Sequence, residues 1–416
     1  MTQIGLHMSV KQLSVLTKNS IIGAAVSYLL TIYLANILGP ETFGVYSYVL
    51  VIAGIVGLVV NYSTDITAAK MSVTEDSKQK VFDLVFAFRL SALLVSGMAL
   101  LVAVYIFEFD GKMAFGVFCV LLASMNLAFL FEICHRNIVY SYIFLLERLL
   151  YVGSVTLFLN LMEPSILLVF WLYFIANVIS LMIQFRVQLP YFRAFSFPTK
   201  GKWIRLLNDN FSLLMIAMAQ LAYGGFSRII FENKYGLEQL GIFSLGLQIT
   251  AAASIFQSQV ERVFRMSISS AISNGKMQDI LSALKRYLCM STLPIGLLAL
   301  VITNWSEEFV TLIFTEDYRS LADLLFLFAS FFVIINLNSL VTMCWVALDE
   351  QRQYFSMSMK FAVVLLVTLY FLPPDVGVSG FILCILAIQI TSLVYASTRF
   401  FLLLKKTISA LNVEGS

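Results

Sequence analysis

The chain has 416 residues, of which 60% are hydrophobic and only 12% are charged, and its mean hydropathy is +0.90. About 25% of the residues in a typical soluble domain are charged, so a water-soluble fold of this chain would expose too much apolar surface. The formal net charge of only +3 gives no reason to expect a nucleic-acid partner. The composition therefore predicts an all-α integral membrane protein, because a helix in lipid satisfies its own backbone hydrogen bonds.

About twelve segments are long and apolar enough to cross a bilayer as helices, since a crossing needs about 20 mostly apolar residues. They are 19–38, 45–66, 81–107, 113–134, 141–162, 165–185, 210–231, 241–260, 287–304, 321–347, 355–372 and 376–398. Turn residues such as Gly39-Pro40, Asp110-Gly111 and Pro373-Pro374 separate neighbouring segments.

Lysine and arginine are concentrated in every second loop and in both chain ends. The opposite loops hold only Lys112, Lys234 and Arg319, and acidic residues predominate there. Because positive charge marks the cytoplasmic side of a membrane protein, both termini are predicted to be cytoplasmic.

The chain contains an internal repeat at an offset of 197 residues. Residues 31–47 read TIYLANILGPETFGVYS, and residues 228–244 read RIIFENKYGLEQLGIFS. Six predicted spans separate the two copies, so both run through the membrane in the same direction. This predicts two six-helix pseudo-symmetric halves, with residues 1–190 and 210–416 joined by a basic cytoplasmic linker at 191–209.

The glycines of the repeat have a specific expected role. Gly39 and Gly44 should occupy the same positions in the first half as Gly236 and Gly241 in the second. All four are expected in sharp outer turns, because glycine reaches positive φ without a steric penalty.

Three arginines lie inside predicted spans, where a charge costs roughly 2.5–3.5 kcal/mol on the insertion scale. Arg89 and Arg148 lie about two turns from the cytoplasmic side, and Arg228 lies nearer the outer side. They could reach the lipid headgroups or pair with carboxylates such as Asp83 and Glu147. Alternatively, they line a cationic cavity that binds an anionic substrate.

Acidic residues in spans are candidates for coupling transport to a proton or sodium gradient. Asp65, Asp83 and Asp323 are such candidates, and ion pairs or interfacial helix caps are the structural alternatives.

Two uncharged polar stripes are candidates for the lining of a cavity. Ser27 and Thr31 lie on one face of the first span, and Thr250, Ser254 and Gln257 lie on one face of the eighth. Small polar faces also favour close helix packing, so both interpretations stay open for these residues.

Several chemistries have no support in the sequence. The five cysteines show no CxxC spacing, the two histidines form no metal-binding cluster, and no P-loop motif is present. No arrangement of nucleophile, base and acid stands out at a membrane surface. The chain is therefore expected to be no enzyme and to need no metal or cofactor.

Lys18-Asn19 at the start of the first span and LGPETFGVYSYV at residues 38–49 carry a family resemblance. They resemble the N-terminal signature of the bacterial O-antigen flippases (Wzx type), in the multidrug/oligosaccharidyl-lipid/polysaccharide exporter superfamily. The resemblance implies a MATE-like fold and a location in the bacterial inner membrane. It also implies flipping of an undecaprenyl-pyrophosphate-linked oligosaccharide, such as an O-antigen unit of lipopolysaccharide, to the periplasmic face.

Under that resemblance, Arg89, Arg148 and Arg228 would bind the pyrophosphate. The partners would be the lipid-linked oligosaccharide, membrane lipids and the polysaccharide polymerase machinery. An ion-coupled exporter of a small solute or drug, built on the same two halves, remains an alternative. A polysaccharide polymerase or ligase is disfavoured because the chain lacks a large outer loop.

Overall fold

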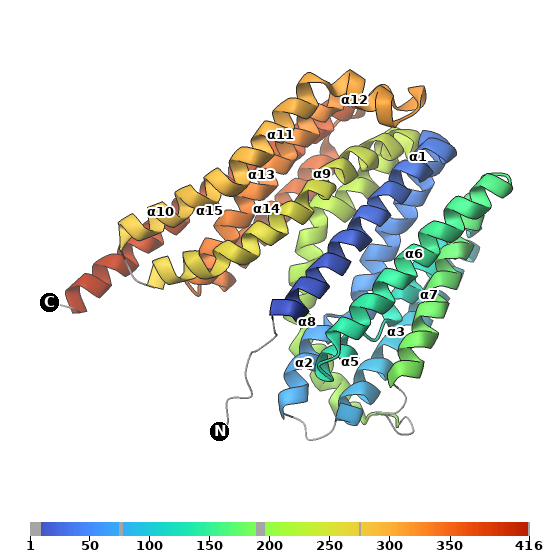
Figure 1. Ribbon diagram of the computed structural model, residues 1–416, viewed down its shortest axis with the longest axis horizontal. Helices are drawn as coiled ribbons and strands as arrows, with labels where there is room; N and C mark the ends of the chain where they lie inside the picture. The colour runs from blue at the N-terminus through green and yellow to red at the C-terminus, as the bar shows by residue number, and fades with distance from the viewer. Residues whose placement is uncertain (1–9, 75–77, 189–195, 274–275, 415–416) are drawn as a thin grey trace. The chain divides into compact units, whose positions relative to one another are not determined.

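A computed structural model describes residues 10–74, 78–188, 196–273 and 276–414, and these residues form helices and turns (Figure 1). They divide into two compact units, which are described separately. The first comprises Met1–Leu38 and Val45–Met218, and the second comprises Gly39–Gly44 and Ala219–Ser416.

The first unit contains most of α1 and the helices up to α8. They are α1 (Val10–Asn61), α2 (Thr64–Thr74), α3 (Lys78–Ile106), α4 (Gly111–Leu121), η1 (Leu122–Met125), α5 (Ala128–Ile133), α6 (Asn137–Leu161), α7 (Ile166–Gln188) and α8 (Lys200–Leu221), which continues into the second unit.

The second unit is built around α13, a long helix with many buried residues. Its elements are η3 (Ala222–Phe226), α9 (Ser227–Ser273), α10 (Met277–Tyr287), η4 (Leu288–Thr292), α11 (Leu293–Asn304), α12 (Ser306–Ile313), η5 (Glu316–Tyr318), α13 (Leu321–Ala347), α14 (Gln351–Phe371), η6 (Pro374–Val376) and α15 (Gly377–Glu414).

Ten segments of the described residues are long and apolar enough to cross a membrane. One of them, Val15–Ala68, has 54 residues and would extend about 80 Å as a straight helix, against about 30 Å of bilayer core. Val15–Ala68 contains the first two predicted spans, and Leu213–Ile249 contains most of the seventh and the start of the eighth. The protein is therefore a multi-pass membrane protein, and the count of twelve crossings stays a prediction.

The two longest helices, α1 and α9, change direction at equivalent glycines of the repeat. Gly39 has φ 72° and ψ 170°, and Gly236 has φ 80° and ψ 177°. Only glycine takes this conformation without strain, so the chain can turn at both places. The two copies of the repeat thus share a local geometry as well as a sequence.

The expected sharp turn is wrong for Gly44 and Gly241, which lie inside helices and do not have a positive φ. This pair instead permits a close backbone contact within the second unit, to which Gly39–Gly44 belongs. A Cβ atom on Gly44 would overlap the carbonyl oxygen of Leu237, and one on Gly241 would overlap that of Pro40. Leu237 is the repeat equivalent of Pro40, so the two contacts are reciprocal.

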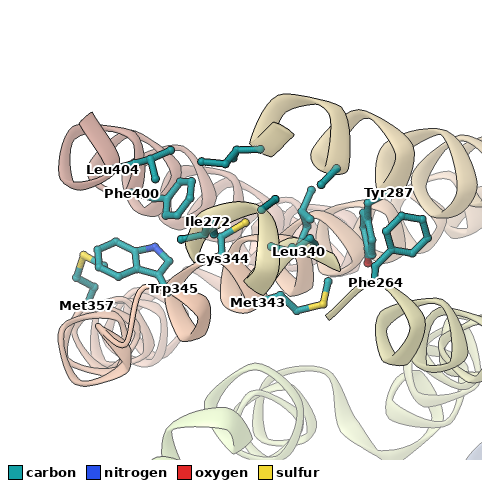
Figure 2. Close-up of a cluster of buried hydrophobic side chains, with 14 residues drawn as sticks. Phe264, Ile272, Tyr287, Leu340, Met343, Cys344, Trp345, Met357, Phe400 and Leu404 are labelled. Atoms are coloured by element: carbon teal, nitrogen blue, oxygen red, sulfur yellow. The ribbon is translucent and has the colours of Figure 1, made fainter. Parts of the chain in front are cut away.

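The core of the second unit surrounds Trp345 on α13, which is fully buried (Figure 2). Met357 from α14 and Phe400 and Leu404 from α15 belong to the same cluster. The indole Nε1 of Trp345 donates to the carbonyl oxygen of Ala396 at 3.2 Å, which satisfies the polar atom of this buried ring.

The basic segment expected as a linker at 191–209 is helical from Lys200 onward, where α8 begins. Leu206 and Asn210 are buried on one face of α8, whereas Arg205 on another face is 83% exposed. Trp203 and Leu206 pack with Phe88 of α3 in one apolar cluster. The amphipathic pattern therefore folds this part of the segment onto the first unit.

Candidate functional site

The fourth predicted span, 113–134, is interrupted in the middle of an apolar run. Helix α4 ends at Leu121, the 3-10 turn η1 follows, and Asn126 is extended at φ −53° and ψ 146° before α5 begins. A helix end leaves backbone donors and acceptors without partners, which is costly in a membrane. Discontinuous helices of this kind often form binding sites in transporters.

Side chains supply the missing partners for the donors of this break. Gln184 Oε1 on α7 accepts a hydrogen bond from the backbone N–H of Leu127 at 2.8 Å. Asn126 Oδ1 accepts from the N–H of Ala128 at 3.2 Å.

Arg89 supplies the partners for the acceptors of the break. It is 1% exposed, and its guanidinium lies 5.1 Å from the centre of the Phe129 ring. Its acceptors are Thr64 Oγ1 (2.9 Å from Nε), Asn61 Oδ1 (3.1 Å from Nη2), Asp65 Oδ1 (2.6 Å from Nη2), and the backbone oxygens of Ser124 (3.4 Å from Nη1) and Asn126 (2.9 Å from Nη1). These five bonds match the five N–H groups of a guanidinium, so Arg89 clamps α1, α2, α3 and the broken helix together.

A polar pocket of about 130 Å³ lies beside the break, inside the first unit. It is lined from η1 and the residues after it, from α6 and from α7, by Ala123, Asn126, Tyr140, Phe144, Glu147, Arg148, Tyr173, Asn177, Ser180, Leu181 and Gln184. A pocket for a drug-sized ligand is typically 300–1,000 Å³, so this one can enclose only a small group or a few waters.

Arg148 is the cation of this pocket. Its guanidinium lies 4.9 Å from the centre of the Phe144 ring, and it makes no hydrogen bond to any residue that the structure describes. It is half-buried, and Glu147 beside it is also half-buried and lines the same pocket. A partly desolvated guanidinium with unused donors is well suited to bind an oxyanion.

Arg228 belongs to the second unit, in the first turn of α9. It is half-buried, and its Nε has no hydrogen-bond partner in the described part of the chain. Arg228 and Arg148 therefore both have unused donors, in contrast to Arg89. Whether the three arginines share one cavity stays a prediction.

The three coupling candidates have different surroundings. Asp65 pairs with Arg89, and its side chain is 37% exposed. Asp83 is buried and accepts from Gln79 Nε2 and Ser196 Oγ, both at 2.7 Å, and not from Arg89. Asp323 is exposed in the first turn of α13, where the helix dipole favours a carboxylate.

The polar stripe of the first span is half-buried, and Thr31 Oγ1 donates to the carbonyl oxygen of Ser27 at 3.1 Å. In the stripe of α9, Gln257 is buried and its Nε2 donates to Glu261 Oε1 at 2.7 Å. The side chains of Thr250 and Ser254 lie outside the described part of the structure.

The sequence interpretation missed the α7 wall of the pocket. Asn177, Ser180, Gln184 and Gln188 are all buried on one face of an otherwise apolar helix. Their spacing of three or four residues is a signal that the sequence already carried.

Among the described residues, no group of three or more His, Cys, Asp or Glu side chains is arranged to hold a metal ion.

The fold matches solved structures of transporters over almost the whole chain. An inward-facing multidrug resistance MATE family transporter of the MOP superfamily aligns with a TM-score of 0.70 and 13% identity, covering 94% of this chain and 99% of that one. An outward-facing transporter of the same description aligns with a TM-score of 0.60 and 15% identity, covering 96% of each chain. A MATE in the straight conformation aligns with a TM-score of 0.56 and 12% identity, covering 95% of this chain and 96% of that one.

At these identities the likeness shows the fold alone, which is the MATE-like fold expected from the sequence. Comparison with the curated proteins gave no match. The family described as "Polysaccharide biosynthesis protein" matches residues 9–264, more than half of the chain. The solved structures that share this fold are described as transporters, which is the class of protein expected from the sequence. The chain belongs to this polysaccharide biosynthesis protein family and has a MATE-like fold.

Proposed function

We propose that the protein flips an undecaprenyl-pyrophosphate-linked oligosaccharide across the bacterial inner membrane by alternating access. The cargo is an O-antigen or related surface polysaccharide unit, carried from the cytoplasmic to the periplasmic face. The family description links the chain to polysaccharide synthesis. The observation that carries the proposal is the guanidinium of Arg148, which lines the polar pocket beside the broken helix and makes no hydrogen bond among the described residues.

The pocket suits the phosphate part of such a substrate. A pyrophosphate that crosses a region of low dielectric constant needs a counter-charge, and a guanidinium offers two parallel N–H donors to phosphate oxygens. Glu147 keeps the empty pocket closer to neutral. The volume of about 130 Å³ is too small for an oligosaccharide, so the sugars occupy space outside this pocket.

The three arginines then have separate roles. Arg148 binds the pyrophosphate first, because the lipid-linked substrate is made on the cytoplasmic face and Arg148 lies in the cytoplasmic half of its span. Arg228 takes over nearer the periplasm. Arg89 holds the broken helix in place, since its five N–H groups are already bonded to protein acceptors.

Of the coupling candidates, Asp65 fits an ion-coupled cycle best. Its carboxylate is bonded to Arg89, and its side chain is 37% exposed. Protonation of Asp65 would weaken its bond to Arg89 and loosen the broken helix, which links an ion gradient to movement around the pocket.

The proposal includes twelve crossings, two six-helix halves and cytoplasmic termini. The 197-residue repeat, the equivalent turns at Gly39 and Gly236, and the distribution of lysine and arginine support this topology. A reporter fused after residue 195 should report the cytoplasm, and periplasmic exposure there would contradict the topology.

Genetic complementation tests the function. In a strain that lacks this gene, lipid-linked oligosaccharide should accumulate and surface polymer should be lost, and the wild-type gene should restore the polymer. The Arg148→Ala variant should not restore it at normal protein levels, whereas Arg205→Ala should, because Arg205 is exposed on α8 of the same unit. Normal polymer in the deletion strain, combined with loss of drug resistance, would instead support the exporter of small solutes or drugs.

A further inference from the structure

An apolar groove of about 450 Å³ lies in the second unit, away from the pocket described above. Leu284 and Leu288 form one wall, Val394 and Phe401 on α15 form the other, and Leu340 and Cys344 on α13 form the floor. Leu340 and Cys344 also belong to the packed cluster around Trp345, and both are labelled in Figure 2. Because 450 Å³ falls in the usual range of ligand pockets, this groove can hold a substantial apolar group.

The walls of the groove are open to the outside of the unit. Val394 is 59% exposed, and Leu288 and Phe401 are 38% and 39% exposed. Both walls lie in segments long and apolar enough to cross the membrane, Met277–Asn304 and Pro374–Lys405. In a bilayer such a groove contacts hydrocarbon chains and not water.

A lysine lies next to each wall, at the end of the groove that is nearer the basic loops of the chain. Lys285 lies three residues before Leu288, and Lys405 lies four residues after Phe401, so each shares a helix face with its wall. Both lysines are exposed, and neither forms an ion pair within the described part of the chain. Asp279 in α10 lies on the opposite face of its helix, so its carboxylate does not neutralise this end of the groove.

Two nearby arginines provide a contrast on the same helices. Arg286 Nη2 lies 3.2 Å from Ser282 Oγ, and Arg399 stacks 6.0 Å from the centre of the Tyr395 ring. Helical geometry places both on faces that point away from the groove. Variants of these two arginines therefore change the overall basic charge at this level of the membrane without changing the charge at the groove.

We propose that this groove binds the acyl chains of an anionic phospholipid and that Lys285 and Lys405 hold its phosphate headgroup. The apolar walls fit the chains, and the two lysines fit the charge of the headgroup. This inference goes beyond the proposed flippase activity and does not depend on it. A lysine near an anionic headgroup typically strengthens binding by about fivefold.

Native mass spectrometry of the delipidated full-length protein tests the proposal. Wild-type protein should retain phosphatidylglycerol in preference to phosphatidylcholine with the same acyl chains. The double variant Lys285→Gln/Lys405→Gln should reduce this preference by at least fivefold, and the matched variant Arg286→Gln/Arg399→Gln should change it less than twofold. A Val394→Trp variant, which fills the groove, should lower the retention of both lipids.

Three results would overturn the proposal. Equal binding of the two lipids by wild-type protein would show that the headgroup is not recognised. Equal losses in the lysine and arginine double variants would show a diffuse attraction to basic charge. Displacement of phosphatidylglycerol by an equimolar amount of undecaprenyl phosphate would identify an isoprenoid chain as the occupant instead.

Discussion

Replacement of Arg89 by alanine should destabilise the first unit strongly. The change removes five hydrogen bonds, leaves the carboxylate of Asp65 without its cation and leaves the carbonyl oxygens of Ser124 and Asn126 without donors. Loss of one partner of a buried pair typically costs about 3–5 kcal/mol. The Asp65 side chain is 37% exposed and can be rehydrated, so the lower end, about 3 kcal/mol, is the expected loss.

A loss of this size is measurable by thermal unfolding of the detergent-solubilised protein. A change of 1 kcal/mol shifts Tm by about 2–4 °C in a unit of 150–250 residues, so Arg89→Ala should lower Tm by roughly 6–12 °C. Arg148→Ala should shift Tm by less than about 2 °C, because Arg148 has no hydrogen bond to lose among the described residues. Wild-type Tm and wild-type membrane levels for Arg89→Ala would refute the structural role assigned to this residue.

Further variants test other parts of the structure. Gly44→Ala and Gly241→Ala should each lower the free energy of unfolding by about 1–3 kcal/mol, because the new Cβ would overlap a backbone oxygen. The control Gly54→Ala should be tolerated, because its new Cβ would meet no atom within 4 Å. Equal Tm values for the three variants would contradict the close contact. Asp65→Asn keeps an acceptor for Arg89 but removes the charge, so transport should persist without its dependence on an ion gradient, and unchanged dependence would exclude Asp65 as the coupling residue. Arg148→Lys should retain partial polymer export, because a point charge still attracts phosphate but cannot bind it in a bidentate manner, and export equal to that of the alanine variant would contradict phosphate binding.

The membrane helices and the turns of the repeat could be predicted because they depend on local patterns. Apolar runs of sufficient length identify membrane helices wherever they occur, and Gly-Pro at 39–40 marks a turn by its own chemistry. The repeat identified Gly236 as the equivalent of Gly39, and the backbone conformations of the two agree.

The break between α4 and α5 could not be predicted in the same way. The sequence around Asn126 continues as an apolar run, and the break is stable because Arg89 and Gln184, on two other helices, bond to its backbone. From the sequence alone, the partners expected for a buried arginine are carboxylates near it in the chain, such as Asp83. The structure instead pairs Arg89 with Asp65 across two helices.

Segment 191–209 shows a different limit of sequence interpretation. Its positive charge predicts a cytoplasmic linker, and this stays a prediction. The structure adds that the apolar residues Trp203 and Leu206 lie on one face of α8 and pack against the first unit. Charge content predicts the side of the membrane on which the segment lies, whereas helical periodicity predicts its structure from Lys200 onward.

Transport of lipid-linked oligosaccharide by the purified protein tests the central claim most directly. Vesicles would contain a fluorescent undecaprenyl-pyrophosphate oligosaccharide, and an enzyme that modifies only the outer leaflet would report its transfer. Wild-type protein should equilibrate the lipid between leaflets. Arg148→Ala should slow this by about 10- to 150-fold, which corresponds to the loss of a charge-assisted hydrogen bond of about 1.5–3 kcal/mol. No transfer by stable wild-type protein, or an unchanged rate in Arg148→Ala, would contradict the account.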